Sequence, residues 1–153
     1  MHAYRGSPAL SGFRATRLLR QVQLAYPSVG GIVAEDVYFV QGEESFSAAD
    51  EKILQDLLGC PPVLSATPPG VMNLVIPRPG TVSPWSSRAT DIASNSGLSV
   101  KRVERGIAYY VEYLDARSDL CLAGCLHDRM TEVVVDRSRR PRSFSKTVPP
   151  SRW

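Results

Sequence analysis

The chain has no long hydrophobic run, which excludes a membrane-spanning helix at the level of sequence. Its apolar stretches end after a few residues, as at Ile32-Val33-Ala34, far short of the roughly 20 residues that cross a bilayer. The first residues, Met1 to Gly6, also lack the apolar segment of a signal peptide. The sequence therefore predicts a cytoplasmic protein with no membrane partner.

Cysteine and histidine are scarce. The three cysteines are Cys60, Cys121 and Cys125, and an odd number without a leader argues against a disulfide framework. A structural zinc site takes four ligands, usually in two spaced pairs, and Cys121, Cys125 and His127 have no second pair. We therefore expect no metal site and expect Cys121 and Cys125 to pack on one side of a helix. Only His2 accompanies His127, which leaves few partners for a catalytic triad.

Acidic residues are missing from the segment 137–153, which carries six arginines and lysines. Residues 1–136 carry twelve basic residues against fifteen acidic ones, so the isoelectric point of about 8.9 originates in this tail. A basic tail suits an anionic partner such as nucleic acid, but few aromatic residues accompany its charges. The composition predicts a disordered Pro/Ser-rich tail and no nucleic-acid partner.

The remaining residues have the composition of one globular domain, with 43% hydrophobic and 22% charged residues. Apolar periodicity and turn residues predict helices at about 8–25, 48–58, 88–96 and 116–127. Strands are predicted at 32–40, 71–76, 100–113 and 131–136. This order favours an α+β domain over residues 1–136, with helices packed on one face of a largely antiparallel sheet.

Two predicted helices have clear start signals. Ser7 and Pro8 are suited to the cap and the first helical position, and Ser47 with Asp50 forms a capping pair. The apolar faces expected to lie in the core are Ala15, Leu18, Leu19 and Val22 on the first helix and Ile53, Leu54, Leu57 and Leu58 on the second.

The segment 77–92 has the most unusual chemistry. Prolines at 77, 79 and 84 restrict its backbone, and Ser86 or Ser87 is expected to cap the following helix, whose Ala89, Ile92 and Ala93 would face the core. A stiff loop before a helix N-terminus with nearby arginines suits a phosphate or a carboxylate. The alternative to a binding site is a purely structural role, in which the segment is a rigid turn and Trp85 packs in the core. The candidate site residues are Arg78, Thr81, Ser83, Trp85, Ser86, Ser87, Arg88, Thr90 and Asp91.

The same segment carries a family resemblance. Residues 78–93 read Arg-Pro-Gly-Thr-Val-Ser-Pro-Trp-Ser-Ser-Arg-Ala-Thr-Asp-Ile-Ala, which resembles the signature of the large-type phosphoribosylformylglycinamidine synthases. The runs at 4–11, 105–110 and 127–132 are also similar to that family and occur in the same order, so the resemblance covers about residues 3–136. Departures from the family pattern are Ile76 for Thr, Arg88 for Lys, Ser94 for His and Ser96 for Cys.

The resemblance implies an N-terminal accessory domain of an ATP- and glutamine-dependent ligase of purine biosynthesis. The full enzyme converts formylglycinamide ribonucleotide to formylglycinamidine ribonucleotide with ATP and magnesium. The domain, similar to the small subunit of split bacterial versions, is expected to cover the synthetase active site and bridge to the glutaminase. By itself it would have no catalytic residues and no cofactor. Arg105, His127 and Arg129 are expected at interdomain contacts, although His127 and Arg129 also suit a helix C-terminus.

Two further interpretations remain. One is a stand-alone, non-enzymatic scaffold subunit that joins its partners in trans. The other concerns the tail, since the family continues into a linker where this chain has its basic run, and this favours a fragment or a truncated reading frame.

Overall fold

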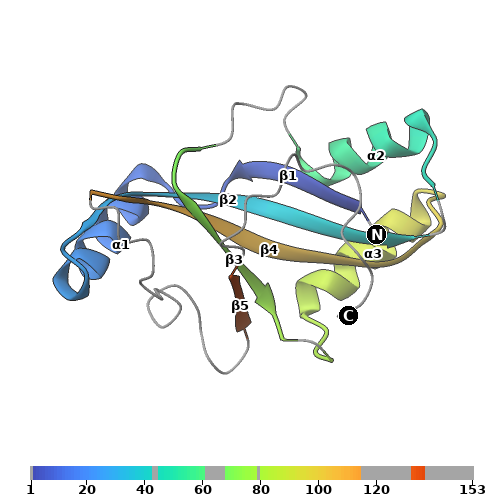
Figure 1. Ribbon diagram of the computed structural model, residues 1–153. Coiled ribbons are helices and arrows are strands. Elements are labelled where there is room, and N and C mark those ends of the chain that lie inside the picture. The colour runs from blue at the N-terminus through green and yellow to red at the C-terminus, as the bar shows by residue number, and fades with distance from the viewer. Residues whose placement is uncertain (1, 43–44, 61–67, 79, 115–131, 137–153) are drawn as a thin grey trace.

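The computed structural model (Figure 1) describes residues 2–42, 45–60, 68–78 and 80–114, and the backbone of 132–136. The predicted helix at 116–127 lies outside these ranges, as does the predicted tail at 137–153. Cys121, Cys125, His127 and Arg129 therefore also lie outside the described residues, and the predictions for them stay predictions.

The centre of the fold is one antiparallel sheet in the order β1-β2-β4-β3-β5. Its long central pair is β2 (Val29–Gly42) and β4 (Val100–Tyr113), flanked by β1 (His2–Pro8) on one side. On the other side lie β3 (Val71–Pro77) and β5 (Glu132–Asp136). The predicted strands are confirmed, and the first predicted strand is longer than expected at both ends.

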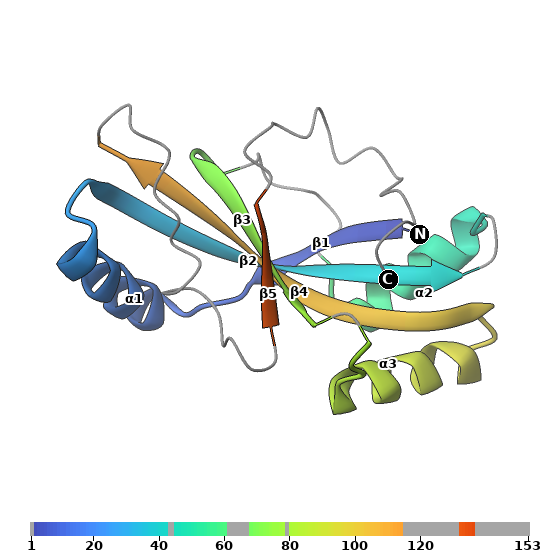
Figure 2. The same cartoon turned by 60° about the horizontal axis from the view of Figure 1, so that its bottom comes forward.

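All three described helices pack on the same face of this sheet, as expected for the α+β class. They are α1 (Gly12–Ala25), α2 (Ala48–Leu58) and α3 (Pro84–Asn95). Because directly paired antiparallel residues share a face, the register places Ile32 and Val40 of β2 on the side of Val111 and Val103 of β4. Figure 2 shows α1 near one end of the long strands and α2 and α3 near the other.

Two apolar clusters hold the helices to that face. Val22 of α1 is fully buried against Ile32 and Val111, while Leu54 of α2 and Ala93 of α3 are buried against Val40 and Val103. Of the predicted α1 face, Val22 is buried and Leu18 and Leu19 pack beside it, whereas Ala15 is half-buried and is not part of this cluster. At roughly 25 cal/mol per Å² of apolar area removed from water, these contacts are the main attraction between helices and sheet.

The opposite face of the sheet has its own core of Val37, Phe39, Met72, Leu74, Ala108 and Tyr110. On the same face, the Arg5 guanidinium donates to both carboxylate oxygens of Glu35 at 2.8–3.0 Å. The pair is nearly buried, with side-chain exposures of 9% and 11%. Mutual hydrogen bonding therefore offsets part of the cost of removing both charges from water.

The start of α1 differs from the prediction. Ser7 and Pro8 end strand β1, and the helix begins at Gly12 with Ser11 as its cap, whose hydroxyl accepts from the Arg14 N–H at 3.4 Å. The Ser-Pro signal is compatible with either structure, because proline fits a strand end as well as a first helical turn. Pairing of β1 with β2 decided between them.

Candidate functional site

The connection before α3 is a closed turn, in keeping with the stiff loop that the prolines predict. The backbone N–H and the hydroxyl of Thr81 both donate to the carbonyl of Arg78, at 3.1 and 2.7 Å. Gly80 lies between them at φ 85°, a conformation that side chains disfavour. The turn thus leads directly to the cap of α3.

Ser83 is that cap, which corrects the expectation that Ser86 or Ser87 would start the helix. Its hydroxyl accepts from the Ser86 N–H at 3.1 Å, and Pro84 occupies the first helical turn. Proline suits that position because its missing N–H would have no helical partner there. The helix therefore begins a turn earlier than its apolar pattern suggests.

α3 is joined to a free edge of β4 by side-chain hydroxyls. β3 pairs with β4 only between Ile107 and Val111, so among the described strands none pairs with the backbone at Val103 on that side. The Ser86 hydroxyl donates to the Val103 carbonyl at 2.5 Å, and the Thr90 hydroxyl accepts from the Val103 N–H at 2.9 Å. These two side chains replace the missing strand and fix where α3 lies.

A buried carboxylate ties the same turn to β4. Glu104 is 2% exposed and accepts from the Ser83 hydroxyl at 3.2 Å, the Arg105 N–H at 3.1 Å and the Arg102 guanidinium at 2.9 Å. Arg102 also donates to the Thr81 carbonyl at 2.7 Å. Since the carboxylate and guanidinium are paired and bonded on several sides, the turn is held on the strand at both of its ends.

Trp85 is the aromatic centre of the site. Its ring stacks on Tyr38 with centroids 5.8 Å apart, and the Arg105 guanidinium lies 5.0 Å from the ring centroid. Tyr38 and Arg105 are direct partners in the β2–β4 register, so the stack spans two strands and a helix. Cation–π attraction stabilises the guanidinium over the indole ring. Among the described residues this exposed guanidinium forms no salt bridge or hydrogen bond, although the Asp36 carboxyl is near enough to interact with its charge.

Asp36 lies on the same sheet face as this stack. Burial raises the pKa of its carboxyl above the ordinary value, and the nearby positive charge of Arg105 acts in the opposite direction. A hollow of about 210 Å³ opens beside Arg105, between the start of α3 and the sheet. It is lined by Val75, Pro77, Ser83, Pro84, Trp85, Glu104, Arg105, Gly106 and Ile107. Its volume is below the range of roughly 300–1,000 Å³ that small-molecule sites have.

The structure separates the sequence-predicted site residues into two groups. Ser86 is fully buried, and Thr90 and Ser83 are half-buried and bonded within the fold. The exposed residues are Arg78, Thr81, Ser87, Arg88 and Asp91. Their role in a site or an interdomain contact stays a prediction. Tyr38 and Asp36 were missed because only the β2–β4 register brings them to the site, and Glu104 was missed because only the packing of the turn on β4 brings it to Ser83.

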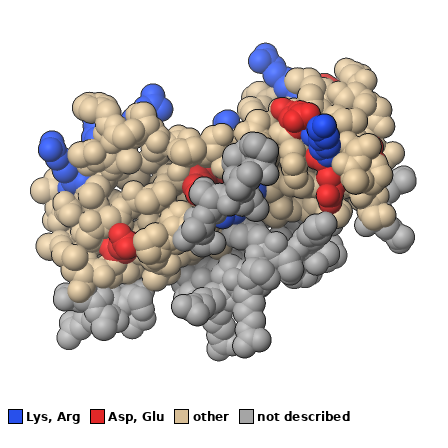
Figure 3. Space-filling model, turned by 90° about the horizontal axis from the view of Figure 1, so that it is seen from above, with Lys and Arg blue, Asp and Glu red and all other residues tan. Residues whose placement is uncertain are grey.

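The surface chemistry of the described residues is mixed. On the face shown in Figure 3, lysine and arginine side chains are scattered among acidic and uncharged ones and form no continuous basic patch. Of the helices in the described ranges, none has the length and apolar character that a membrane crossing requires. Within those ranges no three metal-ligating side chains come together.

A comparison with protein families identifies the domain. The family model described as formylglycinamide ribonucleotide amidotransferase N-terminal matches residues 35–144. The match contains the turn before α3, the whole of α3 and all of β4, the three elements that build the site. Because it covers more than half of the sequence, the chain belongs to the formylglycinamide ribonucleotide amidotransferase N-terminal domain family.

Proposed function

We propose that this domain serves a phosphoribosylformylglycinamidine synthase as an accessory domain that covers the synthetase active site and bridges to the glutaminase. The observation that carries the proposal is the Trp85–Arg105 stack next to the exposed turn at 78–83, all within the family match. Domain contacts are rich in tryptophan and arginine because both combine large contact area with specific polar geometry. A cation with unused donors on an aromatic ring suits a carboxylate or phosphate presented by a neighbouring domain.

Rigidity supports this role. The Ser86, Thr90 and Glu104 hydrogen bonds fix α3 and the turn to β4. A surface that is already ordered loses less conformational entropy when another domain docks on it. The turn is thereby suited to close an active site whose chemistry belongs to another domain.

The chemistry of this domain suits a supporting role. Burial raises the pKa of the Cys60 thiol to about 11, so at neutral pH it is protonated and is a poor nucleophile for glutamine hydrolysis. The 210 Å³ hollow is too small for a nucleotide of ATP size, so its lining does not fit ATP. We therefore assign ATP and magnesium binding, and the catalytic residues, to the other domains of the synthase.

The test is synthase activity of the purified chain, alone and mixed with a complete synthase from which the N-terminal domain has been deleted. We expect no activity from the chain alone and restored activity in the mixture. Activity of the chain alone would contradict the assignment of catalysis to other domains. A folded chain that neither binds nor activates the deleted synthase would contradict the accessory role.

A further inference from the structure

Three apolar residues that the sequence assigns to the core lie at the surface. Ile53 and Leu57 of α2 are 37% and 42% exposed, and Ile92 of α3 is 53% exposed, which corrects the expectation that they are buried. Their helix neighbours Leu54 and Ala93 are buried as expected. The apolar stripe of each helix is therefore wider than the surface that the described fold covers.

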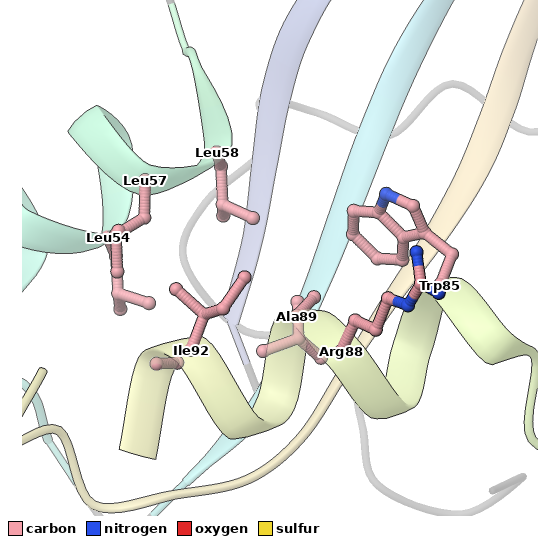
Figure 4. A pocket seen from close by; sticks show the side chains of 9 residues that line it. Leu54, Leu57, Leu58, Trp85, Arg88, Ala89 and Ile92 are labelled. Carbon is pink, nitrogen blue, oxygen red and sulfur yellow. The ribbon is translucent and has the colours of Figure 1, made fainter. Parts of the chain in front are cut away.

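Leu57 and Ile92 line one groove between the two helices. Leu54, Ala93 and Val103 are at most 2% exposed and form its floor, and the groove has a volume of about 270 Å³. Figure 4 shows Leu57 and Ile92 directed from α2 and α3 toward the space between the helices. An apolar cavity of about 150 Å³ holds a benzene molecule, so this groove has room for about two large apolar side chains.

One cation stands in the lining of this groove. Arg88 is exposed and is the charged member of the described lining, and within the described residues no carboxylate pairs with it. Trp85 lies beside it and also lines the hollow next to Arg105. The groove and the site proposed for domain contact therefore share Trp85 as a lining residue. The positive charge of Arg88 complements a partner segment in which an acidic residue follows apolar residues.

We propose that this groove is the docking site for a segment of the remainder of the synthase. The segment presents two large apolar side chains to Leu57 and Ile92 and an aspartate or glutamate to Arg88. The proposal rests on the accessory role and adds the surface and the partner chemistry to it. Helix pairs commonly bind amphipathic segments in this way, with apolar anchors in the groove and charge at its rim.

The test measures binding of the purified full chain to the synthase that lacks its own N-terminal domain, by titration calorimetry. We expect Leu57→Lys and Ile92→Lys each to weaken binding by at least about 30-fold, since each places a charge at a buried anchor. Arg88→Glu is expected to weaken binding by about tenfold, with a smaller salt dependence than the wild type. The matched control is Leu24→Lys, because Leu24 of α1 is 88% exposed and lies outside the groove.

Each outcome decides one question. Loss of binding in the groove variants, with the control and all melting temperatures unchanged, supports the proposal. Wild-type binding that all four variants retain overturns the groove assignment and leaves the accessory role standing. Absence of wild-type binding overturns both. Sedimentation would show whether the wild-type chain is a dimer. A dimer that dissociates in the Leu57→Lys variant would show that a second copy of the chain occupies the groove, and this also overturns the proposal.

Discussion

Replacement of Ser86 by alanine tests whether α3 substitutes for a strand at the edge of β4. Ser86 is fully buried, and its hydroxyl is the donor to the Val103 carbonyl. The alanine variant leaves that carbonyl in the interior without its donor, which costs about 1–3 kcal/mol. In a chain of this size, each 1 kcal/mol lowers the melting temperature by roughly 2–4 °C. We therefore expect a decrease of roughly 4–8 °C for a cost of about 2 kcal/mol.

The assay is thermal unfolding followed by circular dichroism. Ser87→Ala is the matched control, because Ser87 is the next residue, is exposed and is expected to change stability by less than about 0.5 kcal/mol. Thr90→Val should behave like Ser86→Ala, since it removes the acceptor of the Val103 N–H. The double variant should cost less than the sum of both, because the two hydroxyls bond the same backbone segment. Equal melting temperatures for Ser86→Ala and Ser87→Ala would refute the edge argument.

Three further predictions concern function, pH and close packing. In a complete synthase, Arg78→Ala and Arg88→Ala should reduce turnover while the melting temperature stays near that of the parent, and unchanged kinetics in both would remove these arginines from the site. Because burial raises the Asp36 pKa, the native state binds more protons there than the unfolded state, and stability falls as pH rises from about 3.8 through the raised value. At pH values above this range, Asp36→Asn should therefore raise the urea midpoint, and at pH values below it the gain should disappear. A gain that does not depend on pH would contradict the raised Asp36 pKa as its cause. Gly106→Ala should destabilise the folded chain by roughly 1–3 kcal/mol in urea unfolding, because a Cβ would lie 2.8 Å from the Val75 carbonyl oxygen. An unchanged urea midpoint would show that β3 moves aside at little cost.

Alternation and periodicity predicted most of the elements, whereas the local start signals misplaced the first residues of α1 and α3 and β1 was missed. Ser7-Pro8 and Ser83-Pro84 are the same helix-start signal, yet the first ends a strand and the second starts α3. The difference is tertiary, because residues 2–8 find a partner strand in β2. No local rule distinguishes the two dipeptides before that pairing is known.

Sequence alone determined the class of the fold, the family and the stiffness of the turn before α3, because periodicity, prolines and motif residues are local properties. Tertiary structure decided which side chains form the site. Tyr38 and Arg105 meet Trp85 only because β2 and β4 pair in one register. It also decided that Leu57 and Ile92 remain exposed, since a helix pattern identifies an apolar face without identifying what covers it. That covering depends on contacts between elements distant in the chain, which the sequence of a single helix does not contain.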